Sequence, residues 1–382
     1  MNGPPPTFAG VLTPSGRGAV ATVLVDGPQA VEFVSREFVP ALRRLGEELP
    51  ENKIVFGRWG QVPGEEVVIA RRSANKVEIH CHGGVAASAA ILRSLVSHGA
   101  MIQTWPESLS REESDFIRRS ARIGLAQATT ERTANILLDQ YHGALRRKID
   151  AAKLLVAEND SAAAIAGLEE LLRFAPLGLH LTKPWQVVLA GPPNVGKSSL
   201  INALVGYDRA IVFDQPGTTR DVVRANTAFD GWPVELADTA GIRPSDDPLE
   251  TVGVERARQQ LTTADCIVLV FDAAQDRKSD EFRLRDDYPQ AIVVLNKCDL
   301  LSPTSLSQYA SAPSPASLLT STVSGAGLSE LQQRIVQHLV PVVPSSGTAV
   351  PFTAEQVASL QSAHDSLCGG TIVAARSIDS TW

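Results

Sequence analysis

Residues 191–200 read GPPNVGKSSL, a glycine-rich turn that ends in a lysine and a serine. The turn follows an apolar strand-like run, QVVLA, and precedes a helix-like run, SLINALV. In that context backbone N–H groups converge on a phosphate, the lysine neutralises terminal phosphate oxygens, and the serine hydroxyl is a ligand for Mg²⁺. The alternative is a purely structural glycine-rich turn, which the flanking strand and helix disfavour. We therefore predict a nucleoside triphosphate site in which Ser198 holds Mg²⁺.

Two further motifs end predicted strands and identify the nucleotide. Asp238-Thr239-Ala240-Gly241 follows the run VELA, where the carboxylate can reach the Mg²⁺ shell and the glycine N–H the γ-phosphate. Asn296-Lys297-Cys298-Asp299 follows AIVVL. Its aspartate can accept two hydrogen bonds from guanine, which adenine does not offer. The predicted ligand is therefore GTP rather than ATP.

Other parts of the motif set are altered or incomplete. In the segment GTTRD, Thr219 is the predicted second hydroxyl ligand of Mg²⁺, ordered when the γ-phosphate is present. A guanine loop is expected near residue 321, and Ser321-Thr322-Val323 departs from its Ser-Ala-Lys-like pattern, which weakens the predicted base contacts. Ile242 follows Gly241 where many GTPases have a water-orienting glutamine, so another group has to orient the water.

The pattern of residue types along the chain predicts the elements that position these motifs. Residues 1–107 carry β-branched runs and one amphipathic helix, which predict a small α+β domain. The pattern predicts long helices over residues 108–182. It predicts alternating strands and helices, as in a parallel α/β sheet, over residues 183–342, and one more helix in residues 343–382. The predicted fold is an α/β P-loop GTPase domain inserted into a helical domain and preceded by a small α+β N-terminal domain.

Composition limits the class of protein. The 382 residues are 44% hydrophobic and 20% charged, typical of a globular protein with two or three domains. Long apolar runs, a signal-peptide pattern and paired cysteines are missing, so we expect a cytoplasmic protein with no membrane span, disulfide framework or zinc site. The net charge of −7 and the balanced charges of the helical segment predict no basic nucleic-acid surface, so the run Arg146-Arg147-Lys148 is interpreted as solvated helix surface.

The chain resembles the tRNA-modification GTPases of the MnmE (TrmE) type. The resemblance lies in GPPNVGKSSLINAL, DQPGTTRD, DTAGIR, LETVGVERA and NKCD, and also in TPSGRGAVATVLVDGP, VEIHCHGG and LAQATTERTANILL. It implies a folate-binding, dimerising N-terminal domain, a discontinuous helical domain and an inserted G domain. It also implies a homodimer that acts in tRNA wobble-uridine modification with an MnmG-like flavoprotein.

Together with the motifs, the resemblance predicts a full set of site residues. The predicted GTP-binding residues are Asn194, Val195, Gly196, Lys197, Ser198, Ser199, Phe213, Asp214, Gln215, Pro216, Gly217, Thr218, Thr219, Asp238, Thr239, Ala240, Gly241, Asn296, Lys297, Asp299, Ser321, Thr322 and Val323.

The resemblance also implies how the missing glutamine is replaced. GTPases of this type are activated by K⁺ when their G domains pair. The implied K⁺ ligands are Asn194, Phe213, Gln215 and Thr218. Glu250 would orient the water indirectly, and Arg243 would help to order the switch. From the residues alone, the simpler interpretations are favoured: Asn194 as a turn residue and Glu250 as an exposed carboxylate at a helix start.

The chain departs from the family pattern in two places. The family's Cys-x-Gly-Lys tail is not matched, and Cys368 is interpreted as a small buried hydrophobic residue rather than a catalyst. For a bound folate derivative, Glu78 and Arg122 remain as candidates, but Leu24 stands where an arginine is expected. His80 and His82, which alternate along one predicted strand, are interpreted as structural rather than metal-binding.

Two functions therefore compete. One is an MnmE-like enzyme of tRNA modification. The other is a GTPase switch or assembly factor that kept GTP hydrolysis and lost the folate and cysteine chemistry. The order of the domains and the matched N-terminal segments favour the first, while the short C-terminal tail, Leu24 and the altered guanine loop at residue 321 favour the second.

Overall fold

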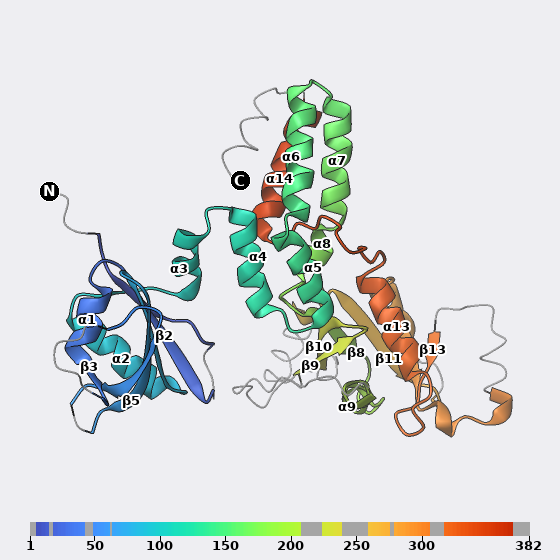
Figure 1. The fold of residues 1–382 in the computed structure, drawn as a ribbon. Helices are drawn as coiled ribbons and strands as arrows, with labels where there is room; N and C mark the ends of the chain where they lie inside the picture. Colours follow the sequence, from blue (N-terminus) through green and yellow to red (C-terminus); the bar gives the residue numbers. More distant parts are fainter. Residues whose placement is uncertain are drawn as a thin grey trace. The chain divides into compact units, whose positions relative to one another are not determined.

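The computed structural model of the chain describes residues 5–14, 18–42, 49–61, 63–207, 224–238, 259–275, 279–305 and 317–369. The chain divides into two compact units, Met1–Ser114 and Asp115–Trp382 (Figure 1). Within the described ranges, no helix is long and apolar enough to cross a membrane.

The first unit is a sheet of seven strands in the order β3-β4-β5-β6-β2-β1-β7. Side chains of β6 alternate between buried and less buried positions, as expected for a sheet that packs helices on one face. The strands are β1 Phe8–Val11, β2 Val20–Asp26, β3 Phe38–Pro40, β4 Ile54–Trp59, β5 Glu65–Ser73, β6 Lys76–His82 and β7 Met101–Ile102.

The helices of the first unit are α1 Ala30–Glu37, α2 Val85–Ser97 and α3 Trp105–Glu112. The first two pack on the sheet, and Ile91 and Leu95 of α2 join Ile69 and Ile79 of the sheet in a fully buried core. The third is held to the first unit by Arg111, whose guanidinium lies 3.8 Å from the ring centroid of Phe8. This unit therefore has a core of its own.

The second unit begins with a run of helices, of which α4, α5 and α7 carry side-chain caps at their N-termini. Asp115, Thr130 and Asp160 each accept a hydrogen bond from a backbone N–H in the first turn of the helix that follows. The helices are α4 Phe116–Gln127, α5 Glu131–Tyr141, α6 Ala144–Ala157, α7 Ser161–Arg173 and α8 Ala175–Leu179.

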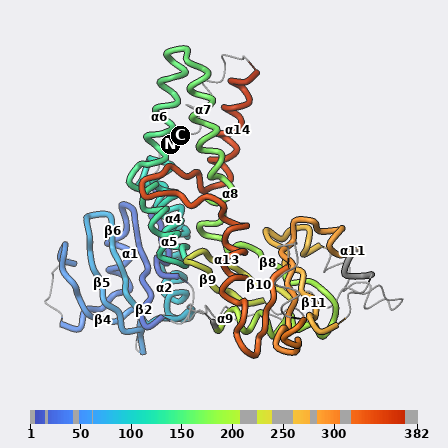
Figure 2. Tube along the Cα trace, turned by 90° about the vertical axis from the view of Figure 1, so that its right-hand side faces the viewer, coloured from blue at the N-terminus to red at the C-terminus, as the bar shows by residue number. Residues whose placement is uncertain are grey.

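The last helix, α14 Ala354–Cys368, lies beside helices from the other end of the unit. It packs along α7, and Figures 1 and 2 both show α6, α7 and α14 side by side. The chain returns to these helices where it left them: a Cβ built on Gly178 of α8 would lie 1.8 Å from the Pro351 carbonyl oxygen. Only glycine allows that close backbone contact.

Between α8 and α14 lies a sheet of six strands in the order β13-β12-β11-β8-β10-β9, with β9 antiparallel and the other five parallel. The strands are β8 Trp185–Ala190, β9 Arg224–Phe229, β10 Trp232–Asp238, β11 Cys266–Asp272, β12 Ile292–Asn296 and β13 Ser317–Leu319. The helices are α9 Lys197–Tyr207, α11 Ser279–Asp287, the 3₁₀ turn η1 Cys298–Leu300 and α13 Leu328–Leu339.

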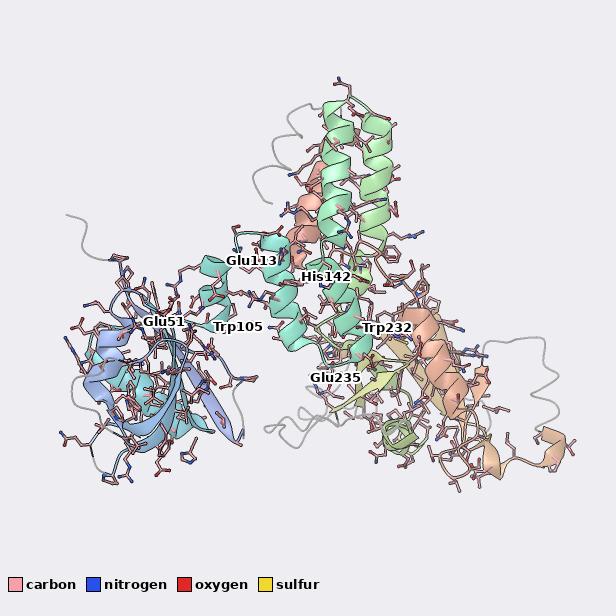
Figure 3. The ribbon with its side chains drawn as sticks, viewed as in Figure 1. Glu51, Trp105, Glu113, His142, Trp232 and Glu235 are labelled. Carbon is pink, nitrogen blue, oxygen red and sulfur yellow. The ribbon has the colours of Figure 1, made fainter. Side chains whose placement is uncertain are left out.

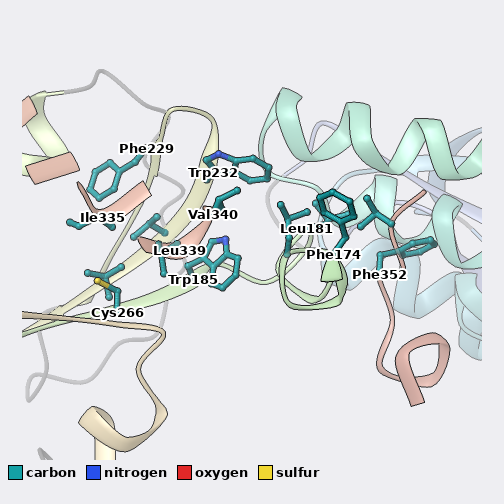
Figure 4. Close-up of a cluster of buried hydrophobic side chains, with 14 of the residues drawn as sticks. Phe174, Leu181, Trp185, Phe229, Trp232, Cys266, Ile335, Leu339, Val340 and Phe352 are labelled. Carbon is teal, nitrogen blue, oxygen red and sulfur yellow. The ribbon is translucent and has the colours of Figure 1, made fainter. Parts of the chain in front are cut away.

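One hydrophobic cluster connects the helices to this sheet. Figure 4 shows Phe174 and Phe352 at one end of the cluster and Phe229 at the other, with Trp185 between them. The fully buried Gln140 of α5 adds polar contacts, since its side chain bonds the Thr348 carbonyl oxygen at 3.0 Å and the Val350 N–H at 3.1 Å. The helices and the sheet of the second unit therefore share a core.

Helix α5 also contacts the hairpin formed by β9 and β10. The Arg132 guanidinium lies 3.1 Å from the Asp230 carboxylate and 5.3 Å from the ring centroid of Trp232. Figure 3 shows the labelled Trp232 on this hairpin near the N-terminal end of α5. Because β10 ends at Asp238, this contact ties α5 to the hairpin that leads into the predicted nucleotide site.

Candidate nucleotide-binding site

The described motif residues gather at the carboxyl edge of the parallel strands. The phosphate loop follows β8, Asp238 ends β10, Asn296 ends β12, and Ser321 lies just after β13. Strand β8 lies between β10 and β11, so the loop sits where strand order reverses. Ligands of open α/β sheets bind in the crevice at such a point.

The phosphate loop is shaped by residues with positive φ. Gly191 has φ +145°, and a Cβ there would lie 2.1 Å from the Val270 carbonyl oxygen. Gly196 has φ +94°, and a Cβ there would lie 2.5 Å from Asn296 Nδ2. Both positions therefore require glycine. Between them, the exposed Asn194 has φ 64°, a region that asparagine enters more readily than most residues.

Lys197 lies inside the loop. It is 7% exposed, and its Nζ donates to the carbonyl oxygens of Gly191 and Pro192, each at 3.1 Å. Burial lowers the pKa of the Lys197 ammonium from its usual value, and the carboxylate of Asp238 opposes that shift. A polyphosphate in the loop would supply further negative charge and favour the ammonium form.

Ser198 and Asp238 meet next to the loop. The Ser198 hydroxyl donates to Asp238 Oδ2 at 2.5 Å. The other carboxylate oxygen of Asp238, Oδ1, is buried and has no hydrogen-bond partner among the described residues. A hydroxyl next to an unsatisfied buried carboxylate oxygen fits Mg²⁺, which prefers oxygen ligands.

Asn296 joins the strand end of β12 to the phosphate loop. The residue is 1% exposed, and its Nδ2 donates to the Val195 carbonyl oxygen at 2.9 Å. Its Oδ1 accepts a hydrogen bond from the Thr320 hydroxyl at 3.1 Å. Both ends of the amide are therefore satisfied, which fixes its orientation.

Asp299 is held by the loop after β13. The Ser321 hydroxyl donates to Asp299 Oδ1 at 2.5 Å and accepts from the N–H groups of Val323 and Ser324 at 3.2 and 3.1 Å. Ser321 therefore contacts the carboxylate of the predicted guanine motif. Thr322 is half-buried, while Val323 is 85% exposed and offers no polar side chain for a base contact.

Lys297 connects three segments of the site. Its Nζ lies 2.7 Å from the Asn194 carbonyl oxygen and 2.7 Å from Asp272 Oδ2. Sequence reasoning assigned no role to Asp272 or to Thr320. A polar residue at the end of an otherwise apolar parallel strand is the signal that points to Asp272, since such ends line the ligand crevice.

Several predicted residues lie outside the described part of the chain. They are Phe213, Asp214, Gln215, Pro216, Gly217, Thr218, Thr219, Thr239, Ala240, Gly241, Arg243 and Glu250. Ser199, which is described, is exposed in the first turn of α9.

The two folate candidates belong to different units. Glu78 of β6 accepts a hydrogen bond from Arg72 at 2.6 Å, and its carboxylate lies 3.6 Å from His80 Nε2. Arg122 is a half-buried residue of α4 in the second unit. A cavity of about 390 Å³ in the first unit is lined by Thr13, Ser88 and Gln103 among others, and Glu78 is not part of its wall. The buried Leu24 pairs directly opposite Glu78 in the sheet.

The histidines of β6 have local partners. His80 Nδ1 lies 3.0 Å from the Thr22 hydroxyl, and His82 Nδ1 lies 2.6 Å from Glu65 Oε1. Within the described ranges, no three histidine, cysteine, aspartate or glutamate side chains form a group suited to a metal ion.

The interpretation of Cys368 as a buried residue is wrong. The side chain is exposed at the last residue of α14, and its Sγ lies 3.8 Å from His364 Nε2. The buried stripe of this helix runs through Gln356, Leu360 and Ala363, and Cys368 lies beyond its end. The other three cysteines are buried, and burial raises the pKa of each thiol, that of Cys266 to about 12.

The chain is similar to several known proteins. A family model described as 50S ribosome-binding GTPase matches residues 186–297. The tRNA modification GTPase MnmE of Geobacillus kaustophilus is 35% identical over 77% of this chain and 73% of its own length. The protein of the same name from Desulfitobacterium hafniense is 34% identical over 78% of this chain and 73% of its own length. That of Carboxydothermus hydrogenoformans is 29% identical over 98% of this chain and 92% of its own length.

Proposed function

Because the chain belongs to the MnmE family of tRNA modification GTPases, we propose that it binds and hydrolyses GTP in the modification of wobble uridine in tRNA. The observation that carries this proposal is the attachment of the guanine motif to the phosphate loop. Asn296 bonds the Val195 carbonyl oxygen, and Ser321 bonds the Asp299 carboxylate at the same edge of the sheet. This arrangement presents a guanine acceptor and a phosphate cradle to one nucleotide.

The predicted site residues have distinct roles in this proposal. Asp299 accepts hydrogen bonds from the guanine base, and Lys197 binds the terminal phosphates. Ser198, Asp238 and Thr219 would hold Mg²⁺, which supplies positive charge to the phosphate oxygens when bound. The unsatisfied Oδ1 of Asp238 supports that assignment. The remaining residues predicted to bind GTP are proposed to contact the same nucleotide.

For hydrolysis, we propose that K⁺ takes the place of a stabilising arginine when two G domains pair. Asn194 would provide a side-chain ligand, with Phe213, Gln215 and Thr218 from the following loop. The positive φ and exposed side chain of Asn194 support its part in this site. Glu250 would orient the attacking water, and Arg243 would help to order the switch. These groups would do the work of the water-orienting glutamine, whose position Ile242 occupies in this chain.

We also propose the four-part organisation expected from the sequence. The G domain, residues 183–342, is inserted between two parts of a helical domain, residues 108–182 and 343–382, and residues 1–107 form the N-terminal domain. The packing of α14 along α7 supports the discontinuous helical domain. A homodimer, a cytoplasmic location, an MnmG-like flavoprotein partner and a bound folate derivative, for which Glu78 is a candidate contact in the N-terminal domain, complete the proposal.

A complementation experiment tests the proposed function. A strain that lacks its own gene of this family would be supplied with this chain, and the modified wobble uridine would be measured by mass spectrometry of digested tRNA. Restored modification is the expected result. GTP hydrolysis by the purified chain without any restored modification would favour the alternative, a GTPase switch or assembly factor. Leu24, which removes a basic group from the position opposite Glu78, is the observation that favours that alternative.

A further inference from the structure

Asp272 is a buried carboxylate beside the nucleotide site that none of the GTP motifs includes. It is the last residue of β11, and its side chain is 5% exposed. Its Oδ1 accepts a hydrogen bond from the Ala274 N–H at 3.0 Å, and its Oδ2 lies 2.7 Å from Lys297 Nζ. A buried carboxylate persists when its charge is paired and its oxygens are bonded, and both conditions hold here.

The same ammonium group reaches the phosphate loop. Lys297 Nζ donates to the Asn194 carbonyl oxygen at 2.7 Å, so one cation links the end of β11 to the loop. Asn194 and Lys297 both have positive φ, 64° and 63°, which costs conformational free energy in a residue with a side chain. Such conformations persist when surrounding contacts hold them, and the ammonium supplies one contact to each segment.

We propose that Asp272 is a positioning residue that acts through Lys297 to hold the Asn194 carbonyl, and with it the phosphate loop, in the conformation that binds the nucleotide. This inference rests on the proposed function, since the loop's ligand is GTP. The carboxylate fixes the direction of the ammonium and balances its charge. Without it, the ammonium loses a charge-assisted hydrogen bond and is free to turn away from Asn194.

The competing explanation is that Asp272 only stabilises the end of β11 through the Ala274 N–H. The two explanations differ in whether the effect of Asp272 depends on Lys297. A double-mutant cycle measures that dependence directly, because an interaction between two residues disappears when either partner is already removed.

Asp265 provides a matched control at the opposite end of the same strand. It immediately precedes β11, its Oδ2 accepts a hydrogen bond from the Gln186 N–H at 2.7 Å, and its Oδ1 lies 3.5 Å from His180 Nε2. Asp265→Asn therefore removes a carboxylate with similar partners on the edge of the sheet away from the phosphate loop. It is expected to leave nucleotide affinity unchanged.

The experiment measures the affinity of the full chain for a fluorescent GDP analogue in Mg²⁺ and Na⁺. Asp272→Asn is expected to weaken binding about tenfold in the wild-type background and less than about twofold in the Lys297→Met background. Asp272→Glu, which restores the charge, is expected to recover most of the lost affinity. The K⁺ concentration that half-activates GTP hydrolysis should be higher for Asp272→Asn than for the wild-type chain, because Asn194 is the proposed K⁺ ligand.

Equal weakening in both backgrounds, or a variant that fails to fold, would make Asp272 a structural residue and overturn the proposal. Unchanged affinity of Asp272→Asn in the wild-type background would overturn it as well. A wild-type chain that bound no GDP would overturn the proposed function together with this inference. Tight wild-type binding without coupling between Asp272 and Lys297 would overturn this inference alone.

Discussion

The hydroxyl of Ser198, in the first turn of α9, donates a hydrogen bond at 2.5 Å to the carboxylate of Asp238 at the end of β10. The second oxygen of that carboxylate is buried without a partner among the described residues. The pair thus brings together two oxygen-bearing side chains from separate elements, as the proposed Mg²⁺ site requires.

Ser198→Ala and Asp238→Asn should each lower the rate of GTP hydrolysis at saturating GTP by at least about tenfold, or about 1.4 kcal/mol. Both should also raise the Mg²⁺ concentration needed for half-maximal rate, because each variant removes one oxygen ligand. Hydrolysis assays titrated with MgCl₂ measure both effects. Ser366→Ala, on the exposed side of α14, is the control. An unchanged Mg²⁺ requirement in both variants would contradict the assignment.

Guanine specificity should depend on Asp299. Asp299→Asn exchanges an acceptor for an amide that also donates, and it should weaken GTP binding by about 1–3 kcal/mol, the usual cost of a mispaired polar group. Ser321→Ala should have a smaller effect in the same direction, since it removes the hydroxyl that orients the carboxylate. Binding titrations with GTP and ATP provide the measurement. GTP affinity equal to wild type in Asp299→Asn would refute the guanine motif.

Hydrolysis should be faster in K⁺ than in Na⁺ at equal ionic strength, and Asn194→Ala should remove the difference. The physical reason is that Ile242 leaves the transition state short of stabilising groups, which a cation of the right size supplies. Rates measured in KCl and NaCl test this expectation. If the wild-type chain hydrolysed GTP equally fast in both salts, the K⁺ mechanism would be excluded.

Glu250 should matter for the chemical step and not for binding. Glu250→Ala is expected to lower kcat by at least about tenfold, or about 1.4 kcal/mol. The affinity for GTP should barely change, because the proposed group acts only in the transition state. Single-turnover hydrolysis in K⁺ measures the effect, and Glu255→Ala is the control. Equal single-turnover rates for Glu250→Ala and wild type would mean that Glu250 is a solvated carboxylate with no part in hydrolysis.

The stability of the second unit should fall in mild acid because of His180. Its ring is stacked on Trp185 with centroids 3.6 Å apart, and burial lowers the pKa of His180 below 6.5, with Asp265 opposing the shift. Above pH 6.5 the imidazole is neutral in both the folded and the unfolded chain. As pH falls below that value, the unfolded chain binds a proton that the folded chain binds less well, so the free energy of unfolding decreases.

Thermal unfolding measured from pH 8 down to pH 5.5 tests this expectation. His180→Phe keeps a ring against Trp185 and should flatten that part of the pH dependence. His142→Gln, which alters an exposed histidine after α5, should leave the dependence as in wild type. If His180→Phe kept the pH dependence of thermal unfolding seen in the wild-type chain, the loss of stability in acid would come from other groups.

The sequence predicted those parts of the site whose chemistry lies in contiguous residues. Each motif supplies a glycine, lysine or carboxylate at a fixed distance from a strand end, so Lys197 and Asp299 could be identified before any fold was known. For Asp272, the polar end of an apolar strand points to the ligand crevice, but its contact with Lys297 does not follow from the sequence, because it depends on β11 pairing beside β12. That relationship is non-local and leaves no pattern along the chain.

The helical and N-terminal parts of the chain show a different limit of prediction from sequence. Hydrophobic periodicity predicted helices over residues 108–175 and strands before residue 106, and those elements are present. The interpretation of Cys368 rests on the general tendency of free cysteines to be buried, and it is wrong because this residue ends α14, beyond the buried stripe of the helix. Periodicity identifies the buried face of a helix without showing how far along the helix its cover extends.

The close contact between Gly178 and Pro351 has a mechanical consequence. The polypeptide that leaves the helices after α8 returns to them at almost the same point, so both covalent connections to the intervening sheet pass through one close backbone contact, beside the core that the helices and the sheet share. A displacement of one connection displaces the other. A rotation of the sheet would therefore twist α8 and the start of α14 together, and a side chain larger than hydrogen at position 178 would wedge the two segments apart.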